Sequence, residues 1–162
     1  MIRIILISLC VINFGASACI AQTNGPQTIA NWGEGVQDVQ MAITMTNNVV
    51  EPGSEIPLLT VIKNSSTNVI TVQEIDMPGD FYVALTGSAG ERYDLIQLPI
   101  IVRSVSFRPI NPGEQEVRTL PVTFGKNIKP GDYTLQATRW FWVESRAYQF
   151  KLVSNSLKVR IK

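Results

Sequence analysis

Few residues in this chain have the types and spacing that catalysis needs. The sequence contains no histidine, which removes Ser-His-Asp and Cys-His arrangements, the common zinc sites and the usual general base near neutral pH. Glu114 and Glu116 lie two residues apart and are expected to share one face of a strand. Glycosidase chemistry needs two carboxyl groups across a cleft, so we interpret this pair as a solvated strand edge.

Two polar clusters are weaker candidates, one for a calcium site and one for a Ser-Lys catalytic pair. Asp76 and Asp80 flank a Pro-Gly turn, but a calcium site needs more oxygen ligands within a short loop. Ser65 and Ser66 follow Lys63 closely, yet a Ser-Lys pair needs a buried lysine with a lowered pKa, and this lysine lies at a turn. The sequence therefore predicts a protein that is not an enzyme and that holds no metal ion and no cofactor.

The segment Arg139-Trp140-Phe141-Trp142-Val143 has an unusual composition. In an alternating strand that turns Tyr133 and Phe141 toward the core, Trp140 and Trp142 face away from it. On an outer face they could stack against sugars or anchor a protein partner. Alternatively, the two rings cover each other or pack under the N-terminal segment with Trp32. Trp140 and Trp142 are the candidate partner-binding residues, and the partners that they suggest are a glycan or another protein.

Tyr133 has a predicted structural role. It follows the Pro130-Gly131 corner and opens the penultimate strand. β-Sandwiches place a tyrosine at this point, and its hydroxyl ties the corner back to the backbone.

The elements that must position these residues have a period of two from Val36 onward. No window of ten or more residues shows a helical stripe. The predicted strands are 39–45, 56–63, 69–74, 81–86, 92–98, 115–124, 133–143 and 147–161, the last with a break at Ser154-Asn155, while 100–107 is either a strand or an irregular crossing segment. Seven or eight short strands predict an all-β, immunoglobulin-like antiparallel sandwich over residues 36–162, after a flexible lead-in at 22–35.

Turn signals separate these strands. Pro-Gly occurs four times, where Pro presets the first turn position and Gly accepts the positive φ of the second. The polar residue that follows each pair is expected to cap the turn. The stretch 87–90 predicts a hairpin, and 64–67 predicts a turn whose side chains bond their own backbone. Asn64-Ser65-Ser66 also matches a glycosylation sequon, which matters only in a glycosylating host.

Residues 1–21 have the features of a bacterial signal peptide. Arg3 gives a positive start, and the apolar run 4–14 is too short to span a bilayer. The small residues Ala16-Ser17-Ala18 suit a leader peptidase. The segment predicts export to the periplasm, the cell surface or the medium.

Cys19 follows those small residues directly. This resembles the lipobox of bacterial lipoproteins, in which the cysteine becomes the lipidated first residue, although Ala16 stands where that family prefers Leu. The alternative is ordinary cleavage before Cys19 or after Ala21. A lipid on Cys19 would be the only membrane attachment. The other cysteine, Cys10, lies in the leader, so the mature chain is expected to have no internal disulfide.

Composition limits the partners further. Hydrophobic residues make up 45% of the 162 residues and charged residues 17%, a globular balance that suits one domain. Loss of Arg3 reduces the 14 basic residues to 13, equal to the 13 acidic ones. This neutral, mixed surface argues against nucleic acid and against electrostatic docking on anionic lipid.

Three segments carry a family resemblance. They are 50–54 with the strand that ends at Lys63-Asn64-Ser65-Ser66, then 128–135, and finally 154–161. This succession resembles bacterial immunoglobulin-like modules, particularly the BsuPI-like group named for an intracellular proteinase inhibitor, over residues 36–162. The resemblance implies an immunoglobulin-like fold and, as one alternative, protease inhibition through a rigid loop at 99–113 or 143–148. The export leader departs from that group's name, and no reactive loop can be matched.

Overall fold

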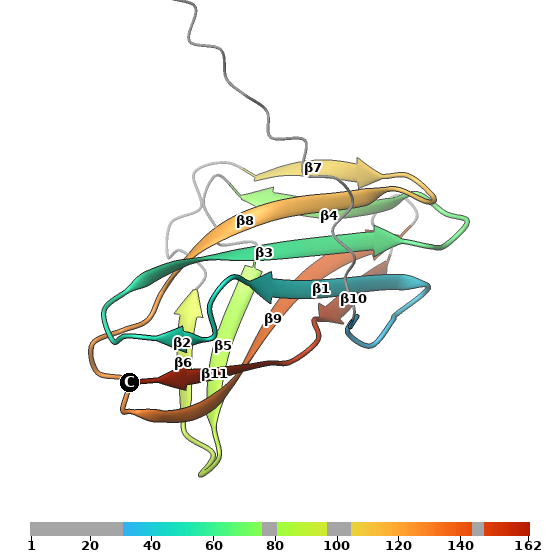
Figure 1. Ribbon diagram of the computed structural model, residues 1–162. Coiled ribbons are helices and arrows are strands. Elements are labelled where there is room, and N and C mark those ends of the chain that lie inside the picture. Colours follow the sequence, from blue (N-terminus) through green and yellow to red (C-terminus); the bar gives the residue numbers. More distant parts are fainter. Residues whose placement is uncertain (1–30, 76–80, 97–104, 144–147) are drawn as a thin grey trace, which may run out of the picture.

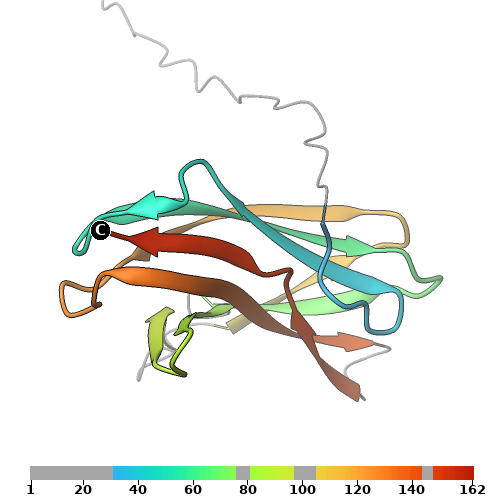
Figure 2. The same ribbon diagram turned by 60° about the horizontal axis from the view of Figure 1, so that its bottom comes forward.

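The fold consists of two stacked β-sheets. The computed structural model describes residues 31–75, 81–96, 105–143 and 148–162, and the regular elements of these ranges are all strands. Figures 1 and 2 show the two sheets lying face to face. The three-stranded sheet contains, in spatial order, β1 (Val39–Met45), β3 (Glu55–Asn64) and β8 (Gln115–Thr123).

The second, eight-stranded sheet is built around the long strand β9 (Gly131–Val143). One flank of β9 pairs with β10 (Tyr148–Val153) and β11 (Leu157–Ile161), and the other pairs with β4 (Ile70–Ile75) and β5 (Phe81–Gly87). The sheet is completed by β2 (Val49–Val50) beside β11, β7 (Val105–Ile110) beside β4 and β6 (Arg92–Ile96) beside β5.

The strand pairing has the immunoglobulin-like pattern. β1 pairs antiparallel with β3 in one sheet, and β2 then pairs parallel with β11 in the other, so the first strand of the fold is divided between the sheets. β3 and β8 face the succession β11-β9-β4-β7, as in sandwiches of this class. The predicted all-β immunoglobulin-like sandwich is confirmed. The β5–β6 hairpin is an addition alongside β9.

Alternation along the strands produces the core. Inward side chains from both sheets form one buried cluster that includes Met41, Ile62, Phe81, Leu135 and Phe141, each at most 1% exposed. Because strand side chains alternate, the same strands leave a second, outward set on each sheet.

The sequence predicted most strands within one or two residues. The strand β2 was not predicted because its two residues are too few to show an alternating pattern. The expected break at Ser154-Asn155 is present between β10 and β11. The Ala137 backbone N–H donates to the Ser154 hydroxyl (2.9 Å), so a side chain replaces part of the interrupted ladder.

The predicted Pro-Gly turn chemistry is confirmed at 52–53 and 112–113, whereas Gly131 has a φ of 156° and begins β9, and Asp132 pairs with Arg160 instead of capping a turn. Gly53 and Gly113 have φ values of 85° and 80°, which suit glycine. The Asn111 backbone N–H donates to Glu114 Oε2 at 2.8 Å, and this bond lowers the pKa of Glu114. The Pro-Gly pair at 78–79 lies outside the described residues.

Asn64 organises the turn that ends β3. Its side chain is fully buried and donates to the carbonyl oxygens of Asn68 (2.8 Å) and Ile110 (2.9 Å). Its Oδ1 accepts from the Ser66 backbone N–H at 3.0 Å and from the Ser66 hydroxyl at 2.6 Å. The sequon asparagine is therefore a structural hub of the folded chain.

The end of the lead-in contacts the sandwich edge. Gly33 donates its backbone N–H to the Met41 carbonyl oxygen at 2.9 Å. A Cβ on Gly33 would meet the Val153 carbonyl oxygen, so the backbone passes very close to the end of β10. Trp32 beside it is half-buried. The signal-peptide residues 1–21, including Cys19, and residues 22–30 lie outside the described ranges.

Candidate binding face

Trp140 and Trp142, the candidate partner-binding residues, lie on the outer face of the eight-stranded sheet, as predicted. Trp140 is 46% exposed, whereas its neighbours Arg139 and Phe141 are buried. Trp142 is half-buried, and its ring meets Phe107 of β7 edge-on, with centroids 5.8 Å apart and an interplanar angle of 79°. Trp142 thus packs against a side chain of β7, which lies beyond β4 in the same sheet, while Trp140 remains the more accessible ring.

Polar side chains surround the two rings. In the strand register Lys151 lies opposite Trp140, and Gln149 lies opposite Trp142 on β10. Thr138, the next outward residue on β9, lies opposite Tyr82 of β5. The result is an open aromatic surface bordered by amide, hydroxyl and ammonium groups.

A pocket lies at the other end of the same face. Its volume is about 350 Å³, and its lining residues are Thr86, Gly87, Ser88, Asp132, Tyr133, Thr134, Gln136 and Lys158. Lys158 Nζ lies 3.2 Å from the Thr134 hydroxyl oxygen. The pocket therefore offers hydroxyl, amide and ammonium groups to a polar ligand.

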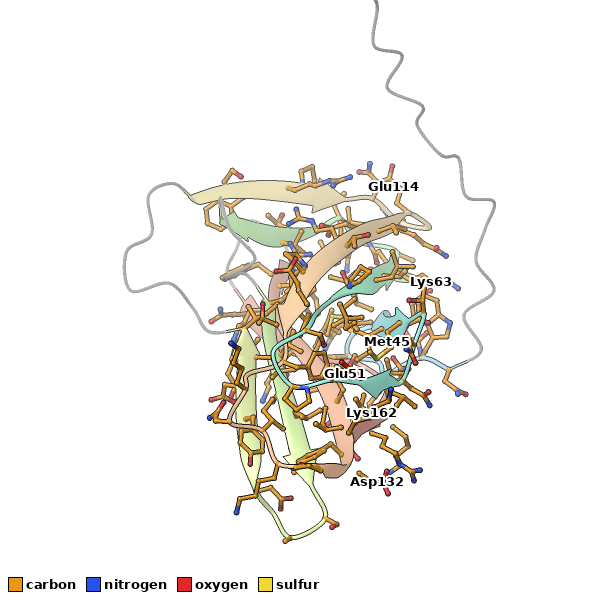
Figure 3. The ribbon with its side chains drawn as sticks, turned by 60° about the vertical axis from the view of Figure 1, so that its left-hand side comes forward. Met45, Glu51, Lys63, Glu114, Asp132 and Lys162 are labelled. Carbon is orange, nitrogen blue, oxygen red and sulfur yellow. The ribbon has the colours of Figure 1, made fainter. Side chains whose placement is uncertain are left out.

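Two ion pairs neutralise part of this face. Arg160 Nε lies 2.7 Å from Asp132 Oδ1, and this contact lowers the pKa of Asp132. Figure 3 places Asp132 at the end of the sandwich that also carries Lys162. On the β5–β6 hairpin, Tyr82 donates its hydroxyl to Asp94. Arg92 contacts both, with Nε 3.3 Å from Asp94 Oδ1. Burial and this hydrogen bond to Asp94 raise the pKa of Tyr82.

The prediction that Glu116 lies on a solvated strand edge is wrong. It is 3% exposed rather than solvated, because it faces the interior of the sandwich. Its Oε2 lies 3.0 Å from Nη1 of the buried Arg139, which reaches it from the opposite sheet. Its Oε1 lies 2.5 Å from Arg118 Nε, an ion pair without hydrogen-bond geometry. Glu114, by contrast, is exposed and caps its turn.

Sequence reasoning also missed Arg139. Its guanidinium lies over the Phe81 ring, 4.5 Å from the centroid, so it packs as part of the core. The alternation of inward and outward positions along the strand could have revealed it, since Arg139 occupies an inward position between Ala137 and Phe141 on β9. An arginine at that position requires a buried carboxylate, and an inward Glu on β8 supplies one.

Tyr133 closes the corner before β9. Its hydroxyl donates to the Lys129 carbonyl oxygen at 2.8 Å. Its ring is buried and meets Tyr93 edge-on, with centroids 6.0 Å apart. Burial raises the pKa of Tyr133, which keeps the hydroxyl available as a donor.

The other candidate residues that the structure describes do not come together as a site. Asp76, Asp80 and residues 99–104 and 144–147 of the two proposed inhibitor loops lie outside the described residues, while 105–110 form strand β7. The Ser66 hydroxyl binds the Asn64 side chain. Within the described ranges no three metal-ligating side chains gather around a common point. The same ranges contain no helix of the length and hydropathy needed to cross a membrane.

Comparisons with known proteins give distant structural likenesses. No family model matches the sequence, and no curated protein matches it. Spo0M, a sporulation control protein from Bacillus subtilis, is 10% identical with a TM-score of 0.49, covering 78% of this chain and 50% of its own. This chain therefore spans about half the length of Spo0M.

Two further solved structures are similar at the same level. The C-terminal domain of wzt is 10% identical with a TM-score of 0.47, covering 81% of this chain and 76% of that domain. A PapD-like domain of human CEP192 is 10% identical with a TM-score of 0.41, covering 78% and 86%. These names describe those proteins alone, and the fold of this chain is defined by its own strand pairing.

Proposed function

We propose that this protein is an exported, non-enzymatic binding module of the bacterial cell envelope, and that its partner contacts the outer face of the eight-stranded sheet. The observation that carries the proposal is Trp140, which is 46% exposed on a regular strand between two buried residues. A large indole ring held out of the core is a typical anchor for a partner. Trp142, which meets Phe107 edge-on, is the next outward residue on the same strand.

The leader sequence supports the proposed location. A signal peptide at residues 1–21 would deliver the domain to the periplasm, the cell surface or the medium. A lipid on Cys19 would hold it at a membrane. The intact mass of protein purified from the native cells distinguishes the lipidated form from ordinary cleavage, because the acyl chains add a defined mass.

Retention on isolated cell envelopes tests the binding function. Protein purified from cells expressing the full chain is mixed with envelopes and sedimented. Trp140→Ala is expected to lower retention at least tenfold, because it removes a large apolar contact while leaving the core intact. Val117→Ala is the matched control, since Val117 is 58% exposed on the other sheet.

The outcomes separate the proposal from its rivals. Equal retention of the two variants, with circular dichroism showing both folded, would contradict the assignment of this face. No retention of the wild type would contradict an envelope partner altogether.

Protease inhibition is the alternative that the BsuPI-like resemblance suggests. An inhibitor would present a rigid loop to a protease cleft. Because 105–110 form β7, Val143 ends β9 and Tyr148 begins β10, the candidate loop residues are 99–104, 111–113 and 144–147. Titration against a panel of serine, cysteine and metalloproteases tests it. Stoichiometric inhibition that leaves the domain uncleaved would replace the envelope-binding proposal, and inhibition of none would remove the alternative.

A further inference from the structure

The outward side chains of β9 form a continuous row, which we call the β9 track: Thr134, Gln136, Thr138, Trp140 and Trp142. Each is exposed or half-buried. A strand advances about 3.3 Å per residue, so the track is about 26 Å long. It begins in the polar pocket, which Thr134 and Gln136 line, and it ends at the two indole rings. It therefore suits an extended ligand better than a compact one.

The charges beside the track are unbalanced. Among the described residues, four basic side chains lie on this face, namely Arg92, Lys151, Lys158 and Arg160, with two acidic ones, Asp94 and Asp132. The two arginines pair with the two aspartates. Lys151 lies opposite Trp140, and Lys158 lies opposite Thr134. Within the described part of the chain neither lysine contacts a carboxylate, so the track has a cation near each end.

The backbone of the track is not available to a ligand. β9 is an inner strand, paired with β10 and β11 on one side and with β4 and β5 on the other. A peptide therefore cannot add to it as a further strand, the route by which sheet edges bind peptides. The track offers side-chain hydroxyl and amide groups and flat indole faces, and the ammonium groups of Lys151 and Lys158 lie beside it. The Asp132 carboxylate, which also lines the pocket, is paired with Arg160.

We propose that the β9 track binds an acidic oligosaccharide, a proposal that rests on the binding function proposed above. Hydroxyl and amide side chains match sugar hydroxyls, and indole faces match the apolar C–H faces of sugar rings. Lys151 and Lys158 match carboxylate groups spaced along the chain. The open pocket holds one end of the ligand, and Trp140 and Trp142 hold the other.

Isothermal titration calorimetry on protein purified from cells expressing the full chain tests this specificity. The probes are oligogalacturonate, its fully methyl-esterified and therefore neutral form, and a poly-glutamate peptide of matching charge. The expected result is binding of oligogalacturonate at least tenfold tighter than that of either comparator, weakening as salt rises.

Variants place the ligand on the track. The double variant Lys151→Ala/Lys158→Ala and the single variant Trp140→Ala are each expected to weaken oligogalacturonate binding at least tenfold. Lys126→Ala, an exposed lysine in the loop before β9, is expected to bind as the wild type does. Unchanged circular dichroism confirms that a weakened variant is folded.

Other results would overturn the inference. Equal binding of the neutral ester, or indifference to the lysine substitutions, would rule out recognition of acidic groups. Poly-glutamate binding of equal strength would assign the face to an acidic protein segment instead. If oligogalacturonate does not bind while envelope retention still depends on Trp140, the oligosaccharide proposal fails and the binding function stands. If neither is observed, both fail.

Discussion

At the scale of single residues, the ion pair between Glu116 and Arg139 departs most from a simple β-sandwich. Both side chains are at most 3% exposed, and their contact joins the two sheets. Removing water from two charges costs several kcal/mol per ion, which their mutual attraction only partly offsets. The pair therefore adds little net stability, yet the loss of either member removes the contact that offsets the desolvation of the other.

Substitution of the pair tests this asymmetry. Arg139→Met is expected to lower the free energy of unfolding by about 3–5 kcal/mol, because the buried Glu116 then loses its buried ion partner and keeps only the partly exposed Arg118. The double variant Glu116→Leu/Arg139→Met is expected to recover most of that loss. Urea denaturation measures both. A single variant that costs under about 1 kcal/mol, or a double variant no more stable than the single one, would contradict this account.

Tyr133 gives a smaller, local test. Tyr133→Phe removes the hydroxyl that donates to Lys129 and keeps the ring. The expected loss is about 1 kcal/mol of unfolding free energy, the usual net value of one hydrogen bond. Tyr93→Phe, on the ring that packs against it, is the matched control and should cost less. A Tyr133→Phe protein as stable as the wild type would show that the corner holds without this bond.

At the scale of elements, Asn155 joins the two sheets where β10 ends and β11 begins. Its Oδ1 accepts from the Ile43 backbone N–H at 2.7 Å, and its Nδ2 donates to the Ile43 carbonyl oxygen at 3.2 Å. The side-chain amide thus pairs with β1 as a peptide group of a neighbouring strand would. Asn155 thus links β1 of the three-stranded sheet to the β10–β11 junction of the other sheet through two side-chain hydrogen bonds.

Asn155→Ala is expected to lower the unfolding free energy by about 1–3 kcal/mol, because it leaves both Ile43 backbone groups without this partner. Hydrogen exchange should become faster at Ile43. Asn155→Asp keeps the acceptor and loses the donor, so an intermediate effect is expected. Ser156→Ala is the control, since Ser156 is exposed. Unchanged exchange at Ile43 in the alanine variant would contradict the bridging role.

Most strands could be predicted from the sequence, because the alternating pattern of each strand lies within its own residues. Alternation along β1, β5 and β9 is visible in sequence because each has one buried and one outer face. β2 escaped prediction because its existence depends on pairing with β11, more than one hundred residues away. Glu116 escaped because a carboxylate in an inward position looks solvated until its partner on another strand is known. The outward placement of Trp140 could be predicted from the alternation along β9 alone.

At the scale of the whole molecule, acid sensitivity follows from two exposed carboxylates. The Asn111 backbone N–H lowers the pKa of Glu114, and Arg160 lowers that of Asp132. Near the ordinary carboxyl pKa of about 4, the folded chain therefore binds fewer protons than the unfolded chain. This contribution to stability is present above that pH and is lost as the pH falls through the lowered values.

Equilibrium unfolding between neutral pH and pH 3 measures the effect. The double variant Glu114→Gln/Asp132→Asn is expected to show a flatter decline of unfolding free energy below about pH 4 than the wild type. Its amide oxygens can still accept the same hydrogen bonds. Glu55→Gln, an exposed carboxylate at the start of β3, controls for the loss of a negative charge. Identical acid limbs in wild type and double variant would contradict the assignment.

The parallel pairing of β2 with β11 has a consequence for mechanical load. The Arg160 backbone N–H donates to the Asn48 carbonyl oxygen at 2.8 Å, and that of Lys162 donates to the Val50 carbonyl oxygen at 3.0 Å. Because these strands run in the same direction, tension applied between the chain ends shears them along their length. Their hydrogen bonds then carry the force together instead of opening one after another. A chain anchored at its N-terminus and pulled at its C-terminus would therefore load this short clamp in shear.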